Sequence, residues 1–284
     1  MSEVNPNRRY PQKLSHPPLP EDNAMPISLG RDLCGALPTA EDREWLVTNG
    51  LGGYACGTIA GVLTRQYHGL LVATLKPPLE RTLLVAKLNE TVYYRQRAYG
   101  LSTDRWADGS VTGQGYRWLE NFTWADGVPT WRYACADLWL EKQVGMAIGA
   151  NTTYVHYHLR RATQPITLKL KIFTNHRSHH HTTQTPTWET QIDPVDHGVQ
   201  IIAFPGATPV YLRSATGTIQ PAHTWYRQHY LAVEAYRGIS PWDDHLHAAT
   251  LQVELQPGAR LTLVASTEAK ASLDGEGVLA AVQQ

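Results

Sequence analysis

Apolar and polar residues alternate along several stretches of this chain, and this two-residue period restricts its fold more than any other feature. In residues 166–172 every second residue is Ile or Leu, with Thr and two lysines between them. Residues 251–255 repeat the pattern, Pro257-Gly258 supplies turn residues, and residues 260–264 alternate again. Because successive side chains on a β-strand point to opposite faces, these segments predict a hairpin with one buried face.

The other strand candidates are separated by Gly, Pro, Asn and Asp rather than by helical segments. They are residues 45–48, 69–75, 82–88, 133–144, 154–160, 199–204 and 210–213. Short helices are expected only within residues 35–43 and 277–284. Many strands joined by turn residues predict an all-β protein, a large antiparallel sandwich or barrel, rather than an alternating α/β fold.

Three regions follow from these patterns. Residues 1–23 are rich in proline and lack an apolar core, which predicts a disordered leader rather than a signal peptide. Residues 24–272 are expected to form one large β-domain. Residues 273–284 begin a helix-prone run without a terminator, which predicts the start of a linker or helix that leads to a further domain.

Charge and cysteine content exclude several function classes. The 25 basic residues balance the 25 acidic ones, so no net charge draws the chain to nucleic acid or to an acidic membrane. No apolar run is long enough to span a bilayer. Three cysteines without a signal peptide indicate reduced thiols and a cytoplasmic location.

The glycine-rich block at residues 44–61 carries the densest motif signal. Residues 50–55 match the dinucleotide pattern G-x-G-x-x-A, but that site needs a helix directly after the loop and an acid about 20 residues later. The following residues are glycine-rich and β-branched, and position 74 is Thr, so a nucleotide site is disfavoured. Tight turns, or close approach of the backbone to a partner domain or a sugar, explain the glycines better.

Arg65, Tyr67 and His68 follow this block. On a strand, Arg65 and Tyr67 would share one face, where a guanidinium and a phenol can hold a sugar hydroxyl or a partner's carboxylate. The alternative is an arginine paired inside its own domain, with Glu44 or Asp42.

Residues 44–54 (EWLVTNGLGGY) and 64–73 (TRQYHGLLVA) resemble the amino-terminal domain of prokaryotic-type glycogen debranching enzymes, the amylo-α-1,6-glucosidases. The resemblance covers about residues 40–270. It continues through Pro77-Pro78, Arg81-Thr82, Leu84–Asn89, Trp131–Tyr133, Glu141-Lys142, Asn151–Tyr157 and Trp225-Tyr226.

This resemblance implies a β-sandwich of the supersandwich type that precedes an α/α toroid, which carries the catalytic carboxylates and hydrolyses α-1,6 branch linkages. The implied partners are an α-glucan and that C-terminal catalytic domain. Eight residues are expected to face one or the other: Asn49, Arg65, Tyr67, His68, Arg177, His180, Trp225 and Tyr226. The family pattern has an aspartate near residues 175–181 that is missing here, although Arg177 and His180 match.

Chemistry within the chain itself is limited. Four histidines in residues 176–181 suggest a polar loop rather than a metal site, so no metal and no other cofactor is expected. Candidate carboxylates such as Glu141, Asp243 and Asp244 cannot be paired by sequence into a glycosidase site, so no catalytic residue is assigned. We expect that the isolated chain does not release glucose; the alternative functions are a stand-alone carbohydrate-binding module and a protein-interaction domain.

Overall fold

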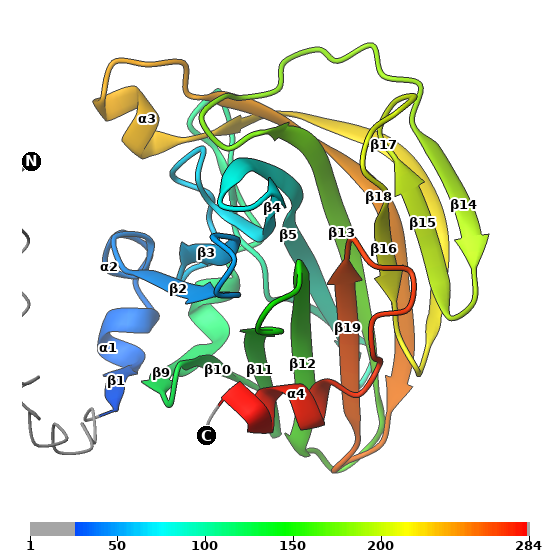
Figure 1. The fold of residues 1–284 in the computed structure, drawn as a ribbon. Coiled ribbons are helices and arrows are strands. Elements are labelled where there is room, and N and C mark those ends of the chain that lie inside the picture. The colour runs from blue at the N-terminus through cyan, green and yellow to red at the C-terminus, as the bar shows by residue number, and fades with distance from the viewer. Residues whose placement is uncertain (1–25, 283–284) are drawn as a thin grey trace, which may run out of the picture.

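The computed structural model describes residues 26–282, which form two large antiparallel sheets packed face to face (Figure 1). The predicted leader, residues 1–23, lies outside the described residues. The nine strands of sheet A, in spatial order, are β1 (Ile27–Gly30), β9 (Leu119–Ala125), β10 (Val128–Cys135), β11 (Leu138–Met146), β12 (Thr152–Arg161), β19 (Arg260–Ser266), β16 (Val210–Arg213), β15 (Gly198–Ile202) and β14 (Gln191–Val195).

Sheet B has eight strands and lies against sheet A. Seven of them are, in spatial order, β17 (Thr218–Tyr230), β18 (Trp242–Leu255), β13 (Ile166–Ser178), β5 (Leu79–Tyr94), β4 (Gly69–Lys76), β3 (Tyr54–Thr58) and β2 (Glu44–Thr48). β6 (Arg97–Gly100) pairs with β5, and β7 (Asp104–Arg105) pairs with β8 (Val111–Thr112) in a separate ribbon. The predicted fold, a large antiparallel β-sandwich, is confirmed.

Helices are short and lie around the sheets. They are α1 (Arg31–Cys34), α2 (Leu37–Glu41), the 3₁₀ turn η1 (Gly115–Trp118), α3 (Ala232–Tyr236) and α4 (Gly275–Val282). In Figure 1, α3 projects from one end of the molecule, and α4 lies across the outside of β11, β12 and β19. None of the helices within residues 26–282 is long and apolar enough to cross a membrane.

The predicted alternation builds the core between the sheets. Leu168, Leu170 and Ile172 of β13 are fully buried there, and Leu251 and Leu255 of the neighbouring β18 join them. Burial of each such side chain stabilises the folded state by about 1.5–3 kcal/mol. The lysines of β13 consequently point out of the sandwich.

Three local expectations differ from the structure. Residues 133–144 form a hairpin rather than one strand, because Ala136 has a φ of +53° and turns the chain in a loop that carries no strong turn signal. Residues 65–67 form a turn, so Arg65 and Tyr67 do not share a strand face. β13 continues to Ser178 and takes in the start of the histidine-rich segment, which was predicted to be a loop.

The glycine-rich block at residues 44–61 contains β2, β3 and the turn between them. Gly50 and Gly52 have φ values of +76° and +97°, a conformation that favours glycine. Strand β3 follows the turn directly, so the helix that a dinucleotide site requires does not form.

All three cysteines are free and lie in different elements. Burial raises the pKa of the Cys34 thiol to about 11. Burial likewise raises the pKa values of Cys56 and Cys135, each to about 12. The thiols are therefore protonated at neutral pH.

Candidate functional site

The outer face of sheet B carries two rows of polar side chains across four strands, which we call the polar rungs. Strand register places Asn89, Lys171, Thr250 and Gln220 in one rung, and Thr91, Lys169, Gln252 and Thr218 in the next. Alternation sends their apolar sequence neighbours into the core, so these groups point outward. Five of the eight rung residues, together with Pro221, line a hollow of about 260 Å³ over β13, β17 and β18: Lys169, Thr218, Gln220, Thr250 and Gln252.

An aromatic edge borders the polar rungs at Tyr226. The Lys171 ammonium donates a hydrogen bond to Tyr226 Oη over 2.9 Å and lies 5.4 Å from the centroid of the tyrosine ring. The ring packs edge-on against Phe173, with centroids 4.9 Å apart, and Trp106 lies 6.4 Å away. These contacts fix the orientation of a half-buried phenol beside the hydrogen-bonding groups of the rungs.

Buried charged and imidazole side chains form a layer beside this aromatic edge, where His229 packs against Trp106 and Phe173. The ion pairs at its ends join Lys87 Nζ to Asp104 Oδ1 and Arg177 Nη2 to Asp243 Oδ2, each over 2.6 Å. Between them the rings of His229 and His245 lie 4.9 Å apart. Burial lowers the pKa of His245 well below its ordinary value, so its ring is neutral. The two ion pairs balance their own charges, so this group carries no net charge.

A second polar group surrounds the turn at residues 63–68. His68 is buried; its Nδ1 accepts a hydrogen bond from the Thr64 amide, and its Nε2 donates to Glu44 over 3.0 Å. Arg65 also bonds to Glu44, over 2.6 Å, so the intradomain pairing that was the alternative for this arginine is the one observed. His68 and Arg65 together lower the pKa of Glu44 to about 2.

Tyr67 and His180 end a chain of four hydrogen-bonding rings near the same turn. Tyr54 Oη lies 2.9 Å from His179 Nδ1, the two histidine Nε2 atoms are 3.1 Å apart, and His180 Nδ1 is 3.3 Å from Tyr67 Oη. Burial lowers the pKa of His179 to about 4. His180 is exposed, Tyr54 and Tyr67 are half-buried, and His179 is buried.

The other predicted residues lie apart from this group or beneath it. Arg177 is buried beside the turn and bonds to the Gln66 carbonyl as well as to Asp243. Asn49 is fully buried in the β2–β3 turn. Trp225 and Tyr226 are neighbours on β17 and point to opposite faces: Trp225 packs on the core, 5.5 Å from the ring of Trp188, and only Tyr226 reaches the outer face.

Several residues of the outer face of sheet B were not predicted as site residues, although the alternation in the sequence indicates two of them. The lysines at 169 and 171 stand opposite the apolar positions of a recognised strand, and that alternation marks them as outward-facing. Trp106 carried no such signal, because it reaches the face from a loop beside β7.

Within residues 26–282 no group of three His, Cys, Asp or Glu side chains is arranged to hold a metal ion. Asp243 and Asp244 accept backbone hydrogen bonds from Thr183 and Thr185 over 2.7 and 2.8 Å, a structural use of both carboxylates.

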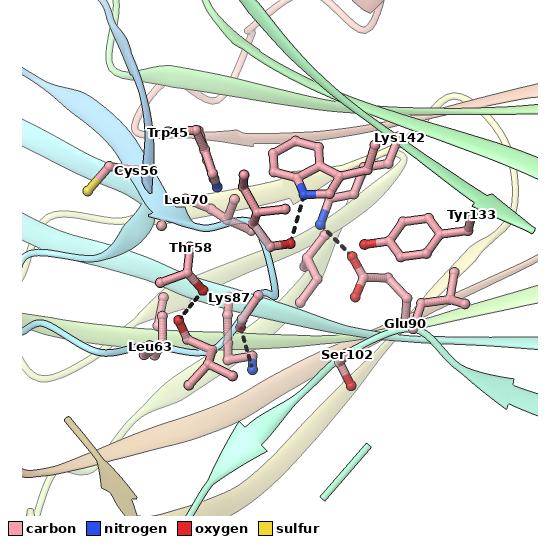
Figure 2. Close-up of a pocket in the computed structure, with 18 residues that line it drawn as sticks. Trp45, Cys56, Thr58, Leu63, Leu70, Lys87, Glu90, Ser102, Tyr133 and Lys142 are labelled. Carbon is pink, nitrogen blue, oxygen red and sulfur yellow. Dashed lines mark hydrogen bonds and ion pairs between the residues drawn. The ribbon is translucent and has the colours of Figure 1, made fainter. Parts of the chain in front are cut away.

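An interior cavity between the sheets is too small for a sugar ring. Its volume is about 50 Å³, enough for a few water molecules, whereas ligand pockets measure about 300–1,000 Å³. Figure 2 shows Glu90 and Lys142 at its polar end, with the Lys142 ammonium 2.6 Å from the carboxylate. Tyr157 donates a second bond to Glu90, so the buried charge is already satisfied.

Fold and face together define a large antiparallel β-sandwich domain with an open polar face edged by aromatic rings. The family model described as "Glycogen debranching enzyme N terminal" matches residues 43–262. The chain belongs to this family, as the sequence motifs predicted.

Two further comparisons add little to this assignment. No curated protein matches the chain significantly. Among solved structures, the GalM/aldose epimerase homologue from C. elegans is similar, with 11% sequence identity and a TM-score of 0.43. The match covers 78% of this chain and 98% of that one.

Proposed function

We propose that this chain is the glucan-contacting domain of a glycogen debranching enzyme, and that the reaction on the α-1,6 branch linkage takes place on a separate catalytic domain. Membership of the family supports the debranching context. The observation that carries the glucan contact is the pair of polar rungs beside Tyr226.

The chemistry of the face suits a neutral, hydroxyl-rich polymer. Amide, hydroxyl and ammonium groups of the rungs supply both donors and acceptors for sugar hydroxyls. A tyrosine ring held by Phe173 and Lys171 offers an apolar surface for the C–H face of a glucose unit at little cost in side-chain entropy. Four neighbouring antiparallel strands present these groups over an extended surface, which fits a chain rather than a single ring.

Native electrophoresis in gels that contain glycogen tests this contact. We expect glycogen to retard the chain, and a Tyr226→Ala substitution to remove most of the retardation. A Gln220→Ala, Gln252→Ala double variant tests the face without touching the aromatic edge, because both side chains are exposed, and it should weaken retardation too.

Tyr236→Ala is the matched control, since Tyr236 is a tyrosine on α3 that is 92% exposed and lies off this face. Its retardation should equal that of the unmodified chain. Unchanged migration of the unmodified chain at saturating glycogen would refute the glucan contact.

A docking role for the β2–β3 turn is the second candidate, and an apolar rim favours it. Gly50 is exposed, Ile148 beside it is 72% exposed, and Leu79 next to the turn is 69% exposed. Apolar side chains gathered at one exposed site mark a contact surface. We propose that this rim contacts the catalytic domain.

We expect this rim to bind a debranching catalytic domain of this family when that domain is supplied as a separate chain. An Ile148→Asp substitution should weaken its binding by at least about tenfold, because a carboxylate loses hydration in an apolar contact. Titration calorimetry measures the effect, with Tyr236→Ala again as the control. Equal affinity for the Ile148→Asp chain would place the contact elsewhere.

A further inference from the structure

An arginine–tryptophan–arginine stack lies on the outer face of sheet A, on the opposite side of the sandwich from the polar rungs. Trp139 of β11 stands between Arg132 of β10 and Arg161 of β12. The two guanidinium carbons lie 5.8 and 5.7 Å from the centroid of the indole. Contacts of this kind hold both arginines in place before any ligand arrives.

A β-bulge brings a third arginine to the same spot. Leu159 pairs with Leu140, and Arg161 pairs with Trp139, so Arg160 is the extra residue on β12. Such an insertion re-aims side chains, and here two successive arginines are both exposed instead of alternating between faces. Arg160 Nη2 bonds to Glu141 over 2.7 Å, while Arg132 Nη2 lies 3.6 Å from the same carboxylate.

The stack borders an open hollow of about 500 Å³ lined by Arg132, Trp139, Glu141, Arg160 and Arg161. The hollow is open to solvent, so it would hold a ligand against the surface rather than enclose it. Three guanidinium groups face one carboxylate, and Arg161 has no ion-pair partner within the described part of the chain. The hollow is therefore positively charged in a protein whose net charge is zero.

The mixture of groups selects the chemistry of a ligand. Guanidinium forks match the oxygens of a phosphate, which favours an anion. The Glu141 carboxylate would repel a bare phosphate but accepts hydrogen bonds from hydroxyl groups, and the exposed indole edge offers an apolar contact. An anionic group joined to a hydroxylated ring satisfies all of these groups at once.

We propose that this hollow is a binding site for the phosphate monoester of a sugar. Arg161 and Arg132 bind the phosphate, and Glu141 accepts bonds from the sugar hydroxyls. The proposal is independent of glucan binding on sheet B, because the two sites share no residue.

Titration calorimetry on the 284-residue chain tests the site with glucose 1-phosphate, inorganic phosphate and glucose. We expect glucose 1-phosphate to bind most tightly, and its affinity to fall by at least about tenfold in Arg161→Ala. Higher salt should weaken binding, since the contact is charged. Arg237→Ala is the matched control, because Arg237 is an ion-paired arginine directly after α3, at the other end of the sandwich, and its affinity should not change.

Each other outcome has a defined meaning. Inorganic phosphate that binds as tightly as glucose 1-phosphate would overturn the sugar part of the proposal, and glucose that binds as tightly would overturn the anion part. No binding of any of the three would overturn the site as a whole. Glycogen retardation should be the same in Arg161→Ala and the unmodified chain, which separates failure here from failure of the glucan contact. Equal melting temperatures of the variants would show that Arg161→Ala remains folded.

Discussion

Asn49 is fully buried, and its side chain bonds to four groups around the β2–β3 turn. Its Oδ1 accepts from the amides of Leu51 and Gly53, and its Nδ2 donates to the Ala150 carbonyl and to Asn151 Oδ1. The sequence motifs predicted that Asn49 faces a glucan or a partner domain, whereas in the structure its side chain is buried and bonds within the turn. A turn rich in glycine has no side chains of its own to satisfy its amides, so a single buried amide supplies the bonds.

Asn49→Ala should therefore lower the free energy of unfolding by about 3 kcal/mol, because it strands buried donors and acceptors in the turn. Urea denaturation measures the loss. Asn49→Asp is the informative comparison: it keeps the acceptor for Leu51 and Gly53 but sets a buried carboxylate oxygen against the Ala150 carbonyl and Asn151 Oδ1, so at neutral pH it should destabilise the fold as well. A midpoint unchanged by Asn49→Ala would contradict a supporting role for this side chain.

The alternation of apolar and polar residues predicted most of the central strands. The predictions failed where a turn lacked recognisable turn residues. β4, β16 and β19 lie close to the predicted ranges, because alternation against one buried face leaves little freedom of register. Short or edge strands such as β1 and β14 carry too few alternating residues to be recognised. The polar rungs depend on pairing among β5, β13, β18 and β17, which are distant in sequence, so no local pattern could assemble them.

Helix α4 packs on sheet A at a place where β11 has a glycine. An added Cβ at Gly145 would meet the side chain of Leu279, which is buried under the helix. Gly145→Val should therefore displace α4 and leave the sandwich intact, since the rest of the core does not depend on this contact. Hydrogen exchange should become faster in residues 275–282 and stay unchanged in β12. Unaltered protection of the helix would show that the sheet adjusts to the larger side chain.

Buried histidines make the stability of the whole molecule depend on pH. Burial lowers the pKa values of His156, His176, His179, His245 and His247 in the folded chain. The unfolded chain takes up protons at the ordinary histidine pKa of about 6.5, while the folded chain does not. The stability that these residues provide is present above that pKa and is lost as pH falls through it toward the lowered values.

The melting temperature should therefore drop between about pH 7.5 and about pH 5, and continue to drop toward about pH 3 as the pKa of Glu44 is approached. Calorimetric scans across this range measure it. His179→Gln cannot be protonated, so its melting temperature should fall less steeply over the upper part of the range. An equal or higher melting temperature at about pH 5 would contradict the assignment of neutral buried imidazoles.

The raised pKa values of the three cysteine thiols have a practical consequence for site-directed labelling. Maleimides and spin labels react with thiolates, and at neutral pH Cys34, Cys56 and Cys135 stay protonated. A cysteine introduced as Tyr236→Cys would sit fully in solvent at the tip of α3 and react first. Fluorescent or paramagnetic probes can thus be attached there without removal of any native cysteine, and report on whatever approaches that end of the sandwich.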